Sequence, residues 1–440
     1  MEGGDGILRG HSRGVTTMDV SPDGKTLVSA DESGGVIMFA LTQYNHQYNL
    51  RASDNSTVLP STKAKDISWA PDGSAFAAGC DQAMTRIFSS TTGTTMRDFF
   101  HEDRSLEVLS VSWSADGKFI ASAASKEGAG EVRVWSTTTE ELVVVLTHTS
   151  SVRVVAFSPI NSERIATGSS DKTVRVWSMQ NGVAVEVQTL KEHVGIVSSL
   201  AWSPDGTRIA SVCTVETQEN YYKNDMDDTA RPAGLGDIQM WNVLTGTSEA
   251  AISCGDGDSD CDETGGCTRT PLSDVAWSPD GSMLAVSTPD RHVRIYDVTT
   301  RSVVFQHEAH NGKVRSVSWS PDSKRLATSG DDSVAVYFFD RVDGGELLAR
   351  YRRIVNEEKE LAKSYPGVSF SPTADVPLIV YSSNDGVLRT RPAPSLRGLD
   401  DLTVRITGVS VNVTAKYLEL TSAENEKSSL ENEEGGDDKS

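Results

Sequence analysis

A segment with alternating aspartates and three cysteines has residue types that suit metal binding. It contains Cys254, Asp256, Asp258, Asp260, Cys261 and Cys267. Alternating aspartates begin an EF-hand calcium loop, but that loop needs Gly at its sixth position and Glu at its twelfth, and cysteines stand at both positions here. The cysteine spacings also do not match a paired zinc site. We therefore interpret the segment as an acidic surface loop and expect neither a metal nor a cofactor.

Histidine is the usual general base of enzymes, and four histidines share one position in a repeated pattern. They are His11, His148, His193 and His310. Their recurrence indicates a structural role in each repeat rather than catalysis at one site. The sequence also lacks a GxSxG nucleophile motif, a P-loop and a dinucleotide fingerprint. We therefore expect a protein without enzymatic activity.

A second insertion mixes aromatic and charged residues. It carries Tyr221, Tyr222 and Lys223, followed by Arg231. Aromatic and arginine side chains are common anchors of protein interfaces. We predict that this segment and the acidic loop contact a protein partner. The alternative is a surface loop whose tyrosines cover its own domain.

These residues are positioned by an element that occurs eight times. The copies are VSPDGKTLVS at 20–29, WAPDGSAFAA at 69–78, WSADGKFIAS at 113–122, FSPINSERIAT at 157–167, WSPDGTRIAS at 202–211, WSPDGSMLAV at 277–286, WSPDSKRLAT at 319–328 and FSPTADVPLIV at 370–380. Pro-Asp-Gly favours a tight turn, and alternating apolar and polar flanks favour strands, so each copy predicts a β-hairpin.

Each copy lies inside a longer unit that predicts four strands. In the unit that begins near residue 148, the strands are expected at 152–157, 164–169, 173–177 and 185–190. Four strands in roughly 40–45 residues are typical of a propeller blade. The sequence therefore predicts an all-β protein with a single β-propeller.

The repeat resembles that of the WD40-repeat family, although the Trp-Asp dipeptide itself does not occur. In that family a His precedes the first strand, an Asp stands in the turn between the second and third strands, and a Trp lies near the end of the third. The matching residues are His11, His148, His193 and His310, then Asp171 and Asp290, then Trp135, Trp177 and Trp241. The resemblance implies that these side chains form a hydrogen-bond network in their blades.

Eight copies predict eight blades, and seven blades with one divergent unit are the alternative. The last copy ends after its third strand, while a lone strand at 6–9 precedes the first copy. We predict that this N-terminal strand completes the last blade and closes the ring. The alternative closing strands are 402–406 and 409–413. We expect a propeller over 1–398, a further strand segment within 399–418, and an acidic tail without fixed structure over 419–440.

The connections between strands differ in length at the two ends of the blades. Successive connections of an antiparallel meander alternate between the two ends of its strands. Those between first and second strands, and between third and fourth strands, are short throughout. The long insertions at 214–236 and 253–271 both fall at the other end, in blade five and in the crossing to blade six. Long loops on a rigid scaffold are usually functional or disordered.

Charge and composition restrict the class of partner. The net charge is −21, from 41 basic and 62 acidic residues, which argues against nucleic-acid binding. No apolar run approaches the roughly 20 residues of a membrane span, and the first residues lack the apolar region of a signal peptide. We expect an intracellular protein, cytoplasmic or nuclear, with no membrane partner.

The expected function is that of a non-catalytic scaffold in a multiprotein complex. The scaffold would bind proteins, with basic segments among the candidates, through the face that carries the long insertions. The alternative is a propeller enzyme or a metal-binding protein with its site over the central channel.

Overall fold

The computed structural model of the chain describes residues 6–41, 45–51, 63–126, 129–180, 182–191, 193, 195–214, 238–252, 274–287, 291–308, 310, 314–330, 334–340, 346–352, 367–372, 378–382 and 388–392. Within these ranges the regular structure consists of β-strands, and no helix there has the length and apolar character needed to cross a bilayer. The strands form eight four-stranded antiparallel sheets. The predicted all-β class is confirmed.

We number the sheets as blades 1 to 8. Blades 1 to 4 consist of β2 (Val15–Val20), β3 (Thr26–Asp31), β4 (Gly35–Ala40) and β5 (Asn45–Arg51); β6 (Ala64–Trp69), β7 (Ala75–Cys80), β8 (Met84–Ser89) and β9 (Thr95–Phe100); β10 (Glu107–Trp113), β11 (Phe119–Lys126), β12 (Ala129–Ser136) and β13 (Leu142–His148); and β14 (Val152–Phe157), β15 (Arg164–Ser169), β16 (Val174–Gln180) and β17 (Val183–Leu190). Blades 5 to 8 consist of β18 (Ile196–Trp202), β19 (Arg208–Thr214), β20 (Ile238–Asn242) and β21 (Ser248–Ile252); β22 (Asp274–Trp277), β23 (Met283–Ser287), β24 (His292–Asp297) and β25 (Ser302–Glu308); β26 (Val314–Trp319), β27 (Arg325–Gly330), β28 (Val334–Asp340) and β29 (Glu346–Arg352); and β30 (Val368–Phe370), β31 (Leu378–Ser382), β32 (Leu388–Pro392) and β1 (Gly6–Leu8).

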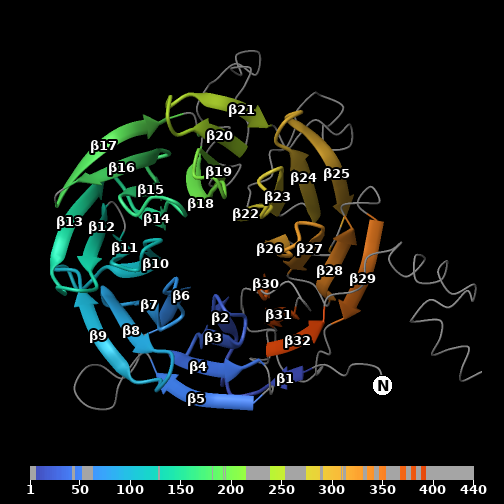
Figure 1. The fold of residues 1–440 in the computed structure, drawn as a ribbon, viewed down its shortest axis with the longest axis horizontal. Coiled ribbons are helices and arrows are strands. Elements are labelled where there is room, and N and C mark those ends of the chain that lie inside the picture. Colours follow the sequence, from blue (N-terminus) through green and yellow to red (C-terminus); the bar gives the residue numbers. More distant parts are fainter. Residues whose placement is uncertain are drawn as a thin grey trace, which may run out of the picture.

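The blades are arranged around a ring, as Figure 1 shows. The first strand of each blade, such as β6 or β18, lies on the inside, and the fourth, such as β9 or β17, lies on the rim. In blade 8 the rim strand is β1, which pairs antiparallel with β32 so that Leu8 lies opposite Leu388. The first and last described strands of the chain therefore share one sheet. The alternative closing strands, 402–406 and 409–413, lie outside the described residues.

The hydrophobic core lies at the seams between blades. One cluster combines Val28 of blade 1 with Trp69 and Phe76 of blade 2, and another combines Val174 of blade 4 with Trp202 of blade 5. A sheet buries each apolar face only by packing on its neighbour, so every blade depends on the two beside it.

The tryptophan that ends an inner strand also joins its blade to the preceding one. Its Nε1–H donates to a backbone carbonyl of the neighbouring inner strand at 3.1–3.2 Å. The five indoles belong to Trp69, Trp113, Trp202, Trp277 and Trp319. Blades 4 and 8 have Phe157 and Phe370 at this position, and there the backbone N–H of the Phe donates to Ser112 Oγ at 3.1 Å and to Ser318 Oγ at 3.2 Å.

The repeated Ser-Pro-Asp-Gly string forms the hairpin between the first and second strands. In blade 5, Ser203 Oγ donates to Asp205 Oδ1 at 2.6 Å and accepts the N–H of Arg208 at 2.9 Å. Gly206 takes a left-handed φ of 64°, which favours glycine. We call the end of the blades with these turns and the β20–β21 type of turn the hairpin face. The opposite end, from which β19 leads into 215–237, is the insertion face.

Candidate functional site

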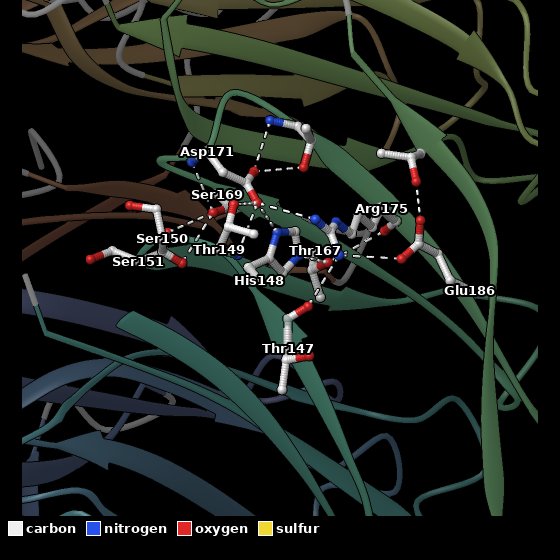
Figure 2. A network of polar contacts seen from close by, with 12 residues as sticks. Thr147, His148, Thr149, Ser150, Ser151, Thr167, Ser169, Asp171, Arg175 and Glu186 are labelled. Atoms are coloured by element: carbon white, nitrogen blue, oxygen red, sulfur yellow. Dashed lines mark hydrogen bonds and ion pairs between the residues drawn. The ribbon is translucent and has the colours of Figure 1, made fainter. Parts of the chain in front are cut away.

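A histidine connects the rim strand of blade 3 to blade 4. His148 ends β13, and its side chain reaches blade 4 (Figure 2). Its Nδ1 lies 3.0 Å from Asp171 Oδ2, and its Nε2 lies 2.7 Å from Thr167 Oγ1. The same hydroxyl accepts the indole N–H of Trp177 at 2.9 Å. The structure thus brings together the three residues that the sequence pattern grouped, with Thr167 as the link between the imidazole and the indole.

The protonation states in this network follow from burial and hydrogen bonding. Burial lowers the pKa of His148, so its imidazole is neutral near pH 7. Burial acts to raise the pKa of Asp171, but hydrogen bonds from Thr173 and His148 outweigh it and lower the pKa to about 2. A neutral imidazole facing a carboxylate carries its proton on Nδ1, so Thr167 donates to Nε2. Each donor in the chain from Trp177 to Asp171 then has an acceptor.

The same link occurs where other histidines follow a rim strand. His11 follows β1, and its ring lies 2.7 Å from Ser29 Oγ and 3.1 Å from Asp31 Oδ2. His310 follows β25 and lies 3.0 Å from Thr328 Oγ1. The second turn aspartate that the repeat pattern identified, Asp290, lies outside the described residues.

In blade 5 the network has an imidazole and an indole on one hydroxyl. His193 Nε2 lies 2.7 Å from Ser211 Oγ, which also accepts the indole N–H of Trp241 at 2.8 Å. Burial lowers the pKa of His193 to about 4. Among the described residues, Nδ1 of His193 has no hydrogen-bond partner. The turn that carries the acid in blade 4 corresponds here to 215–237, which lies outside those residues.

Sequence reasoning missed a fifth histidine, His101, which joins blades 2 and 3. Its Nδ1 lies 2.8 Å from Glu131 Oε1, and its Nε2 lies 2.8 Å from Ser122 Oγ. Trp135, which the pattern did identify, donates its indole N–H to Ser122 at 3.2 Å. The other histidines stand nine residues before the end of the inner strand, whereas His101 stands twelve before Trp113.

One signal in the sequence marks all five histidines. The second strand of their blades carries a hydroxyl at one repeat position, namely Ser29, Ser122, Thr167, Ser211 and Thr328. Blades 2, 6 and 8, in which no described histidine makes this contact, have Ala78, Val286 and Tyr381 at that position. Ser122 was therefore the residue that could have predicted a histidine in the third repeat.

The order of carboxylate, imidazole and hydroxyl in blades 3 and 4 is also that of a hydrolase triad. The hydroxyls of Ser122 and Thr167, however, belong to side chains with 0% exposure. Each hydroxyl also accepts an indole N–H. A nucleophile must reach a substrate carbonyl, so these groups are placed to join blades and not to attack a substrate.

Three half-buried aspartates line the seams between inner strands. They are Asp19, Asp66 and Asp274, and each accepts a backbone N–H from the next blade, at 3.3, 2.9 and 3.3 Å respectively. Burial raises the pKa of Asp19 to about 7 and that of Asp66 to about 6, and it also raises the pKa of Asp274. These carboxyl groups act as hydrogen-bond acceptors that join neighbouring blades.

The predicted partner-binding residues lie outside the described residues. They are Tyr221, Tyr222, Lys223, Arg231, Asp256, Asp258 and Asp260. The structure describes only the strand ends on either side of these segments. They are Thr214 and Ile238 for the first segment, and Ile252 and Asp274 for the second. Over the part of the chain that is described, no group of three or more His, Cys, Asp or Glu side chains is placed to hold a metal ion.

Two family models match parts of the chain. One is described as the first N-terminal beta-propeller of ELP1 and matches residues 7–225. The other is described as the WD40 domain of anaphase-promoting complex subunit 4 and matches residues 267–322.

Curated relatives match this chain over about a third of their own length or less. Pre-mRNA-processing factor 19 of Mus musculus is 28% identical over 188 residues, which cover 42% of this chain and 31% of that protein. Periodic tryptophan protein 2 homolog of Dictyostelium discoideum is 24% identical over 297 residues, which cover 67% of this chain and 30% of that protein. The chain thus spans under a third of the length of these relatives.

A solved structure matches nearly the whole fold. The computationally designed Ika8 protein superposes with a TM-score of 0.64 at 16% identity, covering 88% of this chain and 98% of that one. At this identity the match concerns the fold alone.

Proposed function

Because this chain belongs to the WD40-repeat family, we propose that it is a non-catalytic scaffold that binds protein partners through the insertion face of its propeller. The proposal has two parts, which are the scaffold role and the face that carries it out.

The strand order of the blades is the observation that carries the choice of face. In blade 5 the order is β18-β19-β20-β21, so the β18–β19 and β20–β21 turns lie at one end of the sheet. The segment 215–237 joins β19 to β20, and 253–273 joins β21 to β22 of the next blade. Both segments therefore leave the described strands at the insertion face. Loops on a rigid scaffold are where binding residues concentrate.

The rigid frame supports a role in binding rather than chemistry. The carboxylate, imidazole and hydroxyl groups of blades 3 and 4 hydrogen-bond to one another and so join the blades, and the hydroxyls are buried. Buried and fully paired polar networks stiffen a structure. A stiff ring holds the ends of its strands at fixed separations, which suits the assembly of several proteins on one surface.

The charge of the chain supports partners with basic segments. The net charge is −21, and the segment 253–271 carries Asp256, Asp258 and Asp260. Opposite charge on a partner would speed its association with this face. We place the protein inside the cell, in the cytoplasm or the nucleus, as part of a multiprotein complex.

Deletion of each insertion tests the proposal. Variants that lack 214–236 or 253–271 would be purified from the native cell beside the intact chain, and their bound proteins measured by quantitative mass spectrometry. We expect at least one deletion to reduce bound partners tenfold. A control variant carries two extra residues in the Leu244–Gly246 turn of the hairpin face and should keep its partners. An unchanged partner set in both deletion variants would overturn the choice of face.

A further inference from the structure

A cavity of about 470 Å³ lies between blades 2 and 3 on the hairpin face. Its apolar wall includes Ile87, Met96, Phe99 and Trp113, and its rim includes Asp72 and Asp116. This volume falls within the roughly 300–1,000 Å³ of ligand pockets in proteins. The cavity is separate from the insertion face, because it is lined by the short turns at the opposite end of the blades.

Two residues that line the cavity depart from the repeat. The residue after the end of the inner strand is serine in every copy except the second, which has Ala70. The next residue is proline in every copy except the third, which has Ala115. Both alanines line this cavity. Each alanine has fewer side-chain atoms than the residue found in the other copies, so the lining of this cavity is particular to these two repeats.

The departures also uncover an indole. Trp69, Trp202, Trp277 and Trp319 occupy the matching position in other blades and are 6–8% exposed. Trp113 is only partly buried, although its Nε1–H keeps the seam bond to Ser68. Beside it, Met96 is 57% exposed. An apolar surface with an accessible aromatic ring is thus open to a partner at this seam.

The charged side chains that line the cavity are two aspartates and one arginine, so their net charge is negative. Hydrogen bonds from Ser74 lower the pKa of Asp72, which is therefore ionised. Burial acts to raise the pKa of Asp116, but hydrogen bonds from Ser114 and the Lys118 N–H lower it overall. The third charged residue of the lining, Arg97, is paired with Glu140. The Lys118 ammonium lies 3.4 Å from Asp116 and is mostly exposed, so it can move aside at little cost.

We propose that this cavity binds an arginine side chain of a partner protein, with the aliphatic stem against Met96 and Trp113 and the guanidinium at Asp72 and Asp116. An arginine joins an apolar stem to a flat cation that stacks on aromatic rings and pairs with carboxylates. The walls and the rim of the cavity match these two ends. The site goes beyond the function proposed above, and its failure would leave the insertion face untouched.

Fluorine NMR on the full chain tests the assignment. The eight tryptophans are labelled as 5-fluorotryptophan, and the signal of Trp113 is identified as the one lost in Trp113→Phe. The probe is the tripeptide acetyl-Gly-Arg-Gly-amide. We expect a saturable shift of the Trp113 signal, and at least fivefold weaker binding when citrulline, which has the same shape without the charge, replaces arginine. Equal binding of the citrulline peptide, or no saturable shift, would overturn the proposal.

Matched variants separate the cavity from its surroundings. Ala115→Pro restores the residue found in the other seven copies. The added ring should reduce the space in the cavity and lower the affinity for the arginine peptide at least tenfold. Pro279→Ala makes the reverse change at the same position of blade 6 and should leave the affinity within twofold. Asp72→Asn should weaken binding at least threefold, while Asp205→Asn in blade 5 should not. The other seven fluorine signals report that each variant is folded. An Ala115→Pro variant that is folded and binds as the parent does would contradict the site.

Discussion

Nδ1 of His101 lies 2.8 Å from Oε1 of Glu131, so blade 3 has a histidine link to the preceding blade like that of blade 4. The acid comes from the strand β12 in blade 3 and from the turn before β16 in blade 4. Burial lowers the pKa of His101, and its hydrogen bond lowers that of Glu131. A neutral imidazole that donates to a carboxylate and accepts from a hydroxyl is common to both blades.

Replacing His101 by alanine should destabilise the protein as much as the same change at His148. The substitution removes the imidazole that Ser122 Oγ and Glu131 Oε1 contact, and loss of a buried hydrogen-bond network costs about 2 kcal/mol or more. Urea unfolding followed by fluorescence measures the change. His307→Ala is the control, because His307 lies half-buried on a rim strand. If His101→Ala were as mild as this control, the proposed link would be wrong.

Asp19 should make the protein less stable as the pH rises towards neutrality. Burial raises its pKa from 3.8 to about 7. Between these values the folded chain holds a proton that the unfolded chain has released, so the free energy of unfolding falls as pH increases through this window. Asp19→Asn keeps an oxygen acceptor for Trp69 N–H and cannot ionise. We expect its stability, measured by urea unfolding from pH 5 to 8, to fall less than that of the parent.

Asp205 serves as the control for that titration, because its pKa is lowered in the folded protein, whereas that of Asp19 is raised. Hydrogen bonds from Ser203 and Thr207 outweigh the effect of burial and lower the pKa of Asp205. Its contribution changes below pH 4, so Asp205→Asn should leave the slope between pH 5 and 8 unchanged. His193 titrates between its ordinary 6.5 and about 4 and is present in all three proteins, so it cancels in the comparison. Parallel slopes for the parent and Asp19→Asn would contradict the prediction.

Arg301→Gly should stabilise the turn between β24 and β25. Arg301 has a φ of 57°, in the left-handed region, where the matching turns of blades 2 and 5 have Gly93 and Gly246. Arg301 is exposed, and the turn bond from its N–H to Asp297 is made by the backbone. Relief of the strain should raise the free energy of unfolding by about 0.5–1 kcal/mol. The reverse change, Gly93→Ala, should lower it by a similar amount, and the same sign for both would exclude this explanation.

The fold was predictable because the repeat records it eight times. A single Pro-Asp-Gly turn indicates a hairpin, but its regular return with alternating strands indicates blades, and only a ring places all of them in equivalent surroundings. The links of His148 with Asp171 and Trp177 were predictable for the same reason. The hydroxyl of Thr167 was not, because small polar residues in a strand suit many environments.

Other features depend on distances in space that spacing does not record. His101 was missed because three extra residues precede β10, so its position in the repeat is shifted while its side chain still reaches Ser122. Burial raises the pKa of Asp19, and its contact with the N–H of Trp69 joins residues that lie fifty positions apart in the chain. The cavity at Ala70 and Ala115 needs two repeats to be adjacent before their small side chains add to one space.

The pairing of Gly6 with Thr390 sets the order in which the molecule can be made. Blades 1 to 7 pair strands that are consecutive in the chain, so each can form as its own segment leaves the ribosome. Blade 8 needs both ends of the sequence, and closing so long a loop carries the largest entropy cost of any contact in the ring. Until synthesis passes Thr390, β1 has no sheet to join, and the nascent protein is an open arc with two unsealed seams.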